Sequence, residues 1–256
     1  MNRVSGKLVL VTGASSGIGE ACARRFAAEG AHLVLWARRR ERLTHLAAEL
    51  ERAHGIAVRL APVDVRERAA VSEAAAALVA GGQVPDILIN NAGLAAGLSK
   101  IHEGDVDDWD RMIDTNLKGL LNVTRAILPH MVTRRRGHVV NIGSTAGHMS
   151  YPKGNVYSAT KAGVRALTEG MNLDVAGTPI RVSSVDPGFV ETEFSEVRFR
   201  GDAQRAKAVY HGFTPLSAED VADAIAYVVN LPEHVNIVDL IIVPTAQRNI
   251  YVVDRE

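Results

Sequence analysis

The sequence predicts an α/β fold in which a parallel, doubly wound sheet carries helices on both faces. Short apolar segments alternate with helix-favouring segments along the whole chain. Some apolar segments are continuous rather than alternating, as in Asp86-Ile87-Leu88-Ile89 and Ile241-Ile242-Val243, which is typical of strands covered on both faces. No internal repeat, low-complexity tract or linker rich in proline and serine divides the 256 residues. We therefore expect one domain over residues 1–256.

About seven strands are expected, and helical segments fill the intervals between them. Their approximate bounds are 7–11, 31–37, 57–63, 86–90, 137–142, 181–185 and 238–243. Residues 189–213 are too long for an ordinary connection, and they follow Pro187-Gly188 at the end of a strand. We expect this segment to form a lid over a substrate.

The first strand leads into a glycine-rich segment with the features of a phosphate-binding loop. Glycines let the backbone approach a pyrophosphate closely, and a helix N-terminus offers free N–H groups and a favourable dipole. A tight strand-to-helix turn without a ligand is the alternative interpretation. The position in the first strand–helix unit favours dinucleotide binding. The segment is Thr12-Gly13-Ala14-Ser15-Ser16-Gly17-Ile18-Gly19.

The end of the second strand indicates which dinucleotide binds. Arg38 and Arg39 stand there, and no acidic residue appears before Glu41. A carboxylate at this place hydrogen-bonds the adenosine 2′-hydroxyl of NAD, whereas the 2′-phosphate of NADP needs positive charge. We therefore expect NADP as cofactor. The alternative is that one or both arginines cap a surface turn.

Tyr157 and Lys161 stand four residues apart, and both follow Ser144 in the chain. At this spacing two side chains lie on one face of a helix. We expect the Lys161 ammonium to lower the pKa of the Tyr157 phenol, because an unperturbed value of about 10 makes a poor base at neutral pH. With Ser144, such a pair can move a proton on or off an alcohol oxygen. No Gly-x-Ser-x-Gly motif surrounds Ser144, which argues against a hydrolase.

Composition argues against several other classes of function. Lysine plus arginine and aspartate plus glutamate are balanced at 29 each, so we expect neither nucleic acid nor an anionic membrane as partner. No apolar segment approaches the roughly 18 residues of a membrane span, and the N-terminus lacks a signal-peptide pattern. The single cysteine, Cys22, cannot form an intramolecular disulfide, and the nine histidines show no spacing typical of a metal site. A cytoplasmic protein that acts on a small molecule without a metal is expected.

Together these motifs resemble the short-chain dehydrogenase/reductase family in order and spacing. The glycine segment, Asn90-Asn91-Ala92-Gly93, Asn116, Ser144, Tyr157-x-x-x-Lys161 and Pro187-Gly188 match it over about residues 6–243. Within the family, the segments around Asn116 and Ser144 and the segment 194–202 are similar to bacterial NADP-dependent 3-hydroxy acid dehydrogenases. That group includes serine and L-allo-threonine dehydrogenases. The resemblance implies a Rossmann-type fold, an NADP-dependent alcohol dehydrogenase or reductase, and a homotetramer.

The resemblance also implies a catalytic set of Asn116, Ser144, Tyr157 and Lys161. Ser144 holds the substrate oxygen, and Tyr157 takes its proton in oxidation and donates one in reduction. Lys161 contacts the nicotinamide ribose as well as lowering the pKa of Tyr157, and Asn116 relays protons to it through water. A local hydrogen-bonding role is the alternative for Asn116. A redox sensor or scaffold has no need of the complete set, so we expect an enzyme.

The cofactor contacts implied by the resemblance extend from the glycine segment to the lid. Asp64 and Val65 are expected against adenine, although Asp64 also suits the N-cap of a helix starting at Arg66. Asn91 is expected beside the cofactor, with a simple turn as the alternative, and Thr192 near the nicotinamide. The full set is Gly13, Ser15, Ser16, Gly17, Ile18, Gly19, Arg38, Arg39, Asp64, Val65, Asn91, Tyr157, Lys161, Pro187, Gly188, Val190 and Thr192.

Arg198, in the expected lid, is the candidate for substrate recognition together with Ser144. A guanidinium is a planar, bidentate match for a carboxylate, and a 3-hydroxy acid carries its carboxylate two carbons from the hydroxyl carbon. Three alternatives remain open. Arg198 can instead pair with Glu191, Glu193 or Glu196; Gln247 and Arg248 are weaker candidates for the same task; and the substrate can be sulfoacetaldehyde, a pteridine or a neutral ketone.

Overall fold

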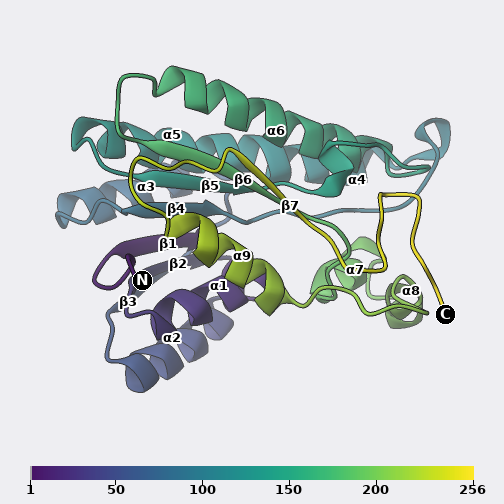
Figure 1. Ribbon diagram of the computed structural model, residues 1–256, viewed down its shortest axis with the longest axis horizontal. Helices are drawn as coiled ribbons and strands as arrows, with labels where there is room; N and C mark the ends of the chain where they lie inside the picture. The colour runs from purple at the N-terminus through teal and green to yellow at the C-terminus, as the bar shows by residue number, and fades with distance from the viewer. Residues whose placement is uncertain (1) are drawn as a thin grey trace.

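The computed structural model describes residues 2–256 and has the predicted architecture, a seven-stranded sheet between two layers of helices (Figure 1). Every strand pair is parallel, in the order β3-β2-β1-β4-β5-β6-β7. Each strand boundary lies within two residues of the one expected from the apolar segments. The strands are β1 Leu8–Thr12, β2 His32–Ala37, β3 Val58–Pro62, β4 Ile87–Asn90, β5 His138–Ile142, β6 Arg181–Pro187 and β7 Asp239–Ile242.

Helices cover both faces of the sheet, as Figure 1 shows. On one face α1 (Gly17–Ala28), α2 (Arg40–His54) and α9 (Ala218–Val229) pack on the apolar side chains of β1, β2 and β6. On the other face lie α3 (Arg68–Ala80), α5 (Leu120–Thr133) and α6 (Asn155–Asp174). The remaining short elements are η1 Ile101–Glu103, α4 Val106–Ile113, the π-helical η2 Asp114–Gly119, η3 Thr145–Gly147, α7 Glu193–Arg198 and α8 Ala203–Ala208.

Burial in the central strands extends to polar residues, including Asn141 of β5 and Ser184 and Asp186 of β6. All residues of β4, β5 and β6 are buried, because helices cover both sides of these central strands. The expectation that Ile241 and Ile242 belong to a strand covered on both faces is wrong, because β7 is an edge strand that alternates exposed and partly buried residues, and Ile241 is 54% exposed. Cys22 is a free thiol buried in α1.

The order of the strands determines where a ligand can bind. The chain proceeds outward from β1 to β3 on one side and then crosses to β4 on the other, so β1 and β4 are neighbours. At such a switch point the loops after adjacent strands diverge and leave a crevice at the carboxyl edge of the sheet. The loops after β1, β4, β5 and β6 all meet at this edge.

The segment 189–213 contains two short helices, α7 and α8, joined by a turn. The C-terminal residues run alongside it (Figure 1): the Arg255 guanidinium donates to the carbonyl of Val209, and the Glu256 N–H donates to that of Gly212 over 2.9 Å. This segment therefore has both its own secondary structure and support from the end of the chain. Among the described residues, no helix is both long and apolar enough to cross a membrane.

Candidate active site

A cleft of about 500 Å³ lies at the carboxyl edge of the sheet, below α7. It is lined by every predicted cofactor-contacting residue except Gly19, and by every predicted catalytic residue except Asn116. Arg198 lines it as well. Residues that are far apart in the sequence therefore meet in one concave site of a size suited to a dinucleotide and a small substrate.

The glycine segment forms the floor of one end of the cleft. Gly13 and Gly17 have φ values of +67° and +53°, which favour glycine. Gly19 does not line the cleft but is required for packing, since a Cβ there would lie 2.4 Å from the Gly13 carbonyl oxygen. Asn91 lines the cleft and also donates to the Thr12 carbonyl oxygen over 2.9 Å. Its amide therefore anchors the glycine segment to the end of β4, a role beyond that of a simple turn residue.

At the same end, Arg39 is held by both the glycine segment and the lid. Its Nε donates to the Ser15 hydroxyl over 3.1 Å, and its Nη1 lies 2.8 Å from a carboxylate oxygen of Glu193 in α7. The other oxygen of Glu193 lies 2.6 Å from Arg42. Arg38 lines the cleft and forms no ion pair among the residues that the structure describes. This end of the cleft thus offers positive charge beside backbone N–H groups.

Asp64 and Val65 line the cleft at the end of β3, but the helix-cap interpretation of Asp64 is wrong. Helix α3 begins at Arg68, with Glu67 at its N-cap position. Asp64 instead accepts from the N–H of Arg66 over 3.0 Å and pairs with its guanidinium at 2.6 Å. The Arg66 guanidinium, and more weakly the charge of Arg38, lower the pKa of the Asp64 carboxyl.

The other end of the cleft holds Ser144, Tyr157 and Lys161. Tyr157 and Lys161 lie one turn apart on α6, as their spacing predicts, and Ser144 follows the end of β5. Lys161 Nζ donates to the Ile142 carbonyl oxygen over 2.8 Å and lies 6.0 Å from the centre of the Tyr157 ring. The ring of Phe194 in α7 packs edge-on against that of Tyr157, with centres 5.7 Å apart. The lid thus covers the phenol.

Burial controls the protonation of this pair. It raises the pKa of Tyr157, an effect that a hydrogen bond with Ser144 and the charge of Arg198 reduce without reversing. The expected lowering of the Tyr157 pKa by Lys161 is therefore not present in this structure, because desolvation of the phenol outweighs the nearby charges. Burial also lowers the pKa of the Lys161 ammonium to about 8. A buried phenol that keeps its proton is suited to donate it.

Asn116 lies behind the cleft, in the π-helical segment η2 between α4 and α5. Its side chain accepts from the N–H of Leu94 over 2.8 Å, donates to the carbonyl of Leu94 over 2.9 Å and donates to the Thr160 hydroxyl over 3.0 Å. These partners are 22 and 44 residues away in the sequence, so the hydrogen bonds of Asn116 are not local ones within its own helix. These bonds connect the loop after β4 to α6 next to Lys161, so Asn116 positions the catalytic helix.

Arg198 extends from the end of α7 into the cleft. Its Nη2 donates to the Tyr151 hydroxyl over 2.6 Å, and its guanidinium carbon lies 5.7 Å from the centre of the Tyr157 ring. It pairs with none of Glu191, Glu193 and Glu196 among the described contacts. Gln247 is buried and accepts from the N–H of Phe189, and Arg248 does not line the cleft. Arg198 is therefore the cation of the lid that approaches Tyr157.

Two further features of this end were not predicted from the sequence. Tyr151 lines the cleft and binds Arg198, although no motif or helical spacing distinguishes it in the sequence. Thr192 lines the cleft but also caps α7, because its hydroxyl accepts from the N–H of Phe194 over 3.2 Å. A Cβ on Gly17 would lie 3.3 Å from Thr192, so the lid approaches the glycine segment closely.

Comparison with known proteins agrees with this geometry. Residues 7–203 match the family model for short chain dehydrogenases. The chain is 49% identical to the NADP-dependent 3-hydroxy acid dehydrogenase YdfG of Salmonella typhi, over 94% of this chain and 96% of that protein. It is 46% identical to sulfoacetaldehyde reductase 2 of Chromohalobacter salexigens, over 97% and 99%. The closed form of a serine dehydrogenase in complex with NADP+ superposes with a TM-score of 0.90, at 48% identity, over 94% of this chain and 96% of that chain.

Proposed function

The chain belongs to the short-chain dehydrogenase/reductase family, and from this premise we propose that it is an NADP-dependent dehydrogenase of small 3-hydroxy acids. The observation that carries the proposal is the position of Arg198 beside Tyr157. A cation there lies near the group that exchanges a proton with the substrate hydroxyl. A substrate with an anionic group two carbons from its hydroxyl carbon can engage both residues.

The arginine-bearing end of the cleft fits NADP. Gly13 lines this end and packs closely on the loop after β4, since a Cβ would lie 2.9 Å from Asn91 Nδ2 and 3.0 Å from Ala92 Cα. The first turn of α1 presents N–H groups that Ser16, at the N-cap, does not satisfy with its side chain. Arg38 and Arg39 supply the positive charge that a 2′-phosphate requires. When bound, NADP accepts or donates the hydride at its nicotinamide ring.

The chain's own residues transfer the proton of the substrate hydroxyl and hold the reacting groups in position. The Ser144 hydroxyl holds the substrate oxygen beside Tyr157, which accepts the hydroxyl proton as the phenolate in oxidation and donates its own proton as the phenol in reduction. The Lys161 ammonium compensates the negative charge that Tyr157 acquires when it gives up its proton. Asn116 holds α6 against the loop after β4, which keeps Lys161 in place. Residues 1–256 act as one catalytic domain in this proposal, with 189–213 as the lid.

The proposed substrates are serine, L-allo-threonine, 3-hydroxypropionate and similar acids, with the corresponding semialdehydes in the reverse direction. Relatives named as a 3-hydroxy acid dehydrogenase and as serine dehydrogenases support a 3-hydroxy acid, and serine in particular. Sulfoacetaldehyde is the second candidate, because a sulfonate offers Arg198 the same negative charge and a relative of 46% identity reduces it. A neutral ketone or a pteridine makes no use of Arg198.

Steady-state assays over carboxylates, sulfonates and neutral secondary alcohols, with NADP and with NAD, test the proposal. We expect the highest kcat/KM for a 3-hydroxy acid with NADP. Arg198→Ala should raise KM for the acids by roughly 10-fold or more, which corresponds to loss of a charged hydrogen bond, and should change KM for a neutral alcohol little. Arg200→Ala is the matched control, because this neighbouring guanidinium pairs with Asp105 outside the cleft. Equal losses on acids and neutral alcohols would refute the role of Arg198, and a preference for sulfoacetaldehyde would select the second candidate.

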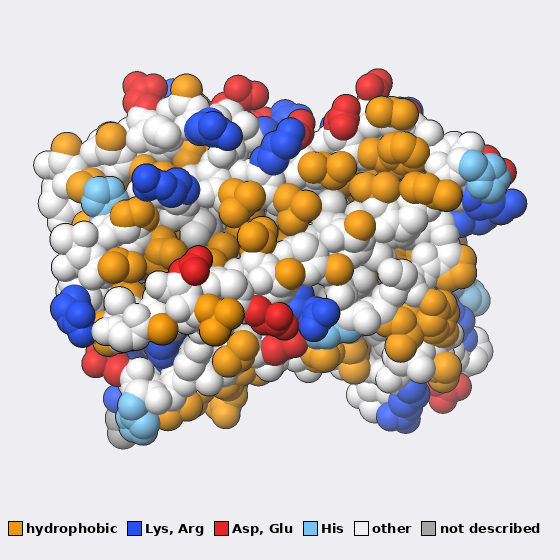
Figure 2. All heavy atoms as spheres, turned by 90° about the horizontal axis from the view of Figure 1, so that it is seen from above, with side chains coloured by type: hydrophobic (Ala, Val, Ile, Leu, Met, Phe, Trp, Pro, Cys, Tyr) orange, Lys and Arg blue, Asp and Glu red, His pale blue; other side chains and the backbone are white. Residues whose placement is uncertain are grey.

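For assembly and location, the proposal is a homotetramer in the cytoplasm. Figure 2 looks onto the face that carries α6 and shows apolar side chains gathered on it. Large apolar residues are exposed on the helices and on the edge strand, including Leu121, Leu173, Tyr227 and Ile241. Such surface is typical of contacts between subunits. Light scattering after size exclusion should give four times the 27.5 kDa mass of one chain.

A further inference from the structure

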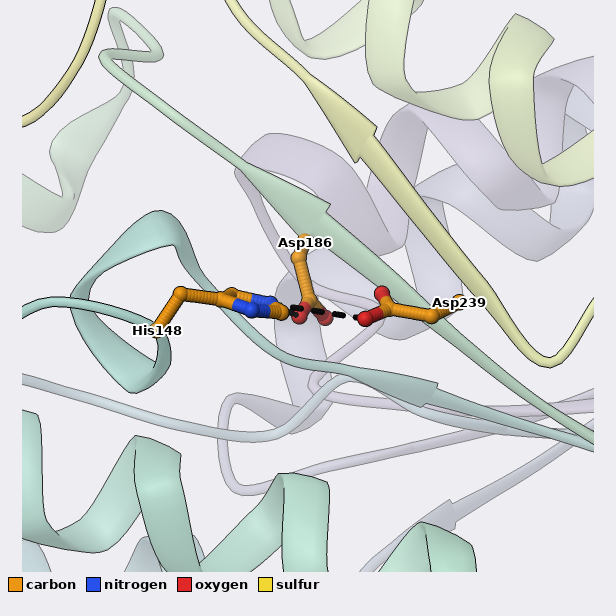
Figure 3. A group of neighbouring side chains, drawn as sticks. All are labelled: His148, Asp186 and Asp239. Carbon is orange, nitrogen blue, oxygen red and sulfur yellow. Dashed lines mark hydrogen bonds and ion pairs between the residues drawn. The ribbon is translucent and has the colours of Figure 1, made fainter.

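His148, Asp186 and Asp239 come from three separate elements and meet at the end of the sheet (Figure 3). His148 follows η3, Asp186 lies in β6 and Asp239 begins β7. The imidazole Nε2 of His148 contacts Asp186 Oδ2 directly and lies 3.6 Å from Asp239 Oδ2. The contact between His148 and Asp186 is a hydrogen bond between their side chains. The group is therefore a hydrogen-bonded cluster centred on Asp186.

Asp186 is the buried member of this cluster, with 1% of its surface exposed. Both of its oxygens accept hydrogen bonds, one from His148 and the other from the Ser184 hydroxyl. Its carboxyl group presses against the backbone of Gly143, where a Cβ would lie only 1.9 Å from Oδ1. Position 143 thus requires glycine, because the carboxylate occupies the space that a side chain would take.

The same stretch of backbone connects Asp186 to the catalytic lysine. Ile142, next to Gly143, accepts the hydrogen bond from Lys161 Nζ over 2.8 Å. The peptide between Ile142 and Gly143 therefore has an ammonium bound at its carbonyl and a carboxylate packed against its glycine. Burial lowers the pKa of Lys161, and the negative charge of Asp186 opposes that change. Ser144 follows directly, so both charges adjoin the substrate-holding residue.

The neighbouring charged groups act on this pair from several elements. From α6, Lys161 and Tyr157 face Asp186, while Arg165 acts on Asp239. From β7, Asp239 adjoins Asp186, and burial together with the charge of Asp186 raises the pKa of the Asp239 carboxyl. In its protonated form, Asp239 can donate a hydrogen bond to Asp186.

We propose that Asp186 is a positioning residue whose buried carboxylate, held by Ser184, His148 and Asp239, keeps the Lys161 ammonium charged at neutral pH. The inference rests on the proposed function, because that function assigns to Lys161 the charge that compensates Tyr157. Asp186 contacts neither the substrate nor the cofactor in this account. Its negative charge acts on Lys161, and it also contributes to the raised pKa of Tyr157.

The titration of Lys161 itself tests this inference without any substrate. The chain has only six lysines, so the signals of 13C-labelled lysine side chains can be assigned with a Lys161→Met variant. We expect Asp186→Asn to lower the pKa of Lys161 by roughly 1 unit, because an opposite charge has been removed. Asp223→Asn is the matched control, since this exposed carboxylate on α9 pairs with Arg25. In Asp239→Asn the pKa of Lys161 should stay close to its wild-type value, because the amide of the new asparagine can donate a hydrogen bond to Asp186.

The kinetic profile supplies a second readout. In Asp186→Asn the alkaline pKa of the kcat profile should move in the same direction as the Lys161 titration, with NADPH binding retained. A merely structural role would lower activity without moving either titration. An unchanged Lys161 pKa in folded Asp186→Asn overturns the inference, and Asp186→Ser provides the same charge removal if the asparagine variant does not fold. If wild type oxidises no 3-hydroxy acid, the proposed function fails while the Lys161 titration still decides this inference.

Discussion

The two ends of the cleft handle charge in different ways. The arginine end consists of Arg38, Arg39 and the lid residue Glu193, and the side chains of Arg39 and Glu193 are 42% and 38% exposed. The tyrosine end consists of Ser144, Tyr157 and Lys161, where Ser144 and Lys161 are only 8% and 7% exposed. Exposed charges interact weakly with each other and remain available to a ligand, whereas buried groups have strongly shifted pKa values. The arginine end is therefore suited to selecting a ligand, and the tyrosine end to moving a proton.

The largest effect should come from the tyrosine end. Tyr157→Phe keeps the ring that packs on Phe194 but removes the exchangeable proton, so turnover should fall on the order of 10²–10⁴-fold. NADPH binding, followed by fluorescence, should persist. Tyr227→Phe on the exposed face of α9 serves as control and should keep full turnover. Near-normal turnover in folded Tyr157→Phe would show that the tyrosine end of the cleft does not move the proton.

Lys161→Met should lower turnover, on the order of 10²-fold, but make the protein more stable at neutral pH. Below pH 8 the folded wild type carries a buried ammonium, and the variant does not. After allowing for the lost hydrogen bond to Ile142, the gain should be about 1–2 kcal/mol.

The sign of the pH dependence follows from the lowered pKa of Lys161. Between pH 8 and the ordinary lysine pKa of about 10.4, the unfolded chain binds more protons than the folded one, so wild-type stability rises with pH in this window. Urea unfolding at pH 7 and pH 10 should show the advantage of Lys161→Met shrinking as pH increases. If Lys161→Met is less stable than wild type at pH 7, the Lys161 ammonium is not a desolvated charge that destabilises the fold.

At the arginine end, Arg38→Asp should change cofactor choice while sparing chemistry. Repulsion of the 2′-phosphate should shift the ratio of kcat/KM for NADP over NAD by roughly 10- to 100-fold toward NAD, as expected for a charged hydrogen bond replaced by a like charge. Arg40→Asp is the control, since Arg40 does not line the cleft. If the wild-type protein uses NAD better than NADP, Arg38 and Arg39 do not serve to bind a 2′-phosphate.

The smallest effect should come from Glu193→Gln. It removes two exposed ion pairs, with Arg39 and Arg42, each contributing about 0–1 kcal/mol. Because the carboxylate competes with a phosphate for Arg39, NADPH should bind a few-fold more tightly to the variant at low salt and equally at high salt. Glu196→Gln on the same helix should leave the dissociation constant unchanged. Weaker NADPH binding by Glu193→Gln would show that the lid carboxylate assists the cofactor instead.

The fold was predictable because its signals are local. Short apolar segments between helix-favouring segments mark the strands in the sequence to within two residues, although buried polar residues interrupt β5 and β6. The glycine segment and the four-residue spacing of Tyr157 and Lys161 are likewise short-range patterns whose geometry follows from one strand–helix turn and one helix. These patterns were sufficient to place most of the candidate site in one cleft.

The protonation and support of the site depend on contacts between distant segments. Burial of Tyr157 comes partly from Phe194 in α7, and the lysine effect expected from spacing alone is outweighed by that desolvation. Asn116 is held by Leu94 and Thr160, and Tyr151 meets Arg198 only because the lid folds back over β5 and α6. Asp186 reaches Gly143 through the pairing of β5 with β6. Spacing along the chain therefore identified the reacting groups, while their pKa values and partners arose from tertiary packing, because desolvation depends on atoms that no local pattern specifies.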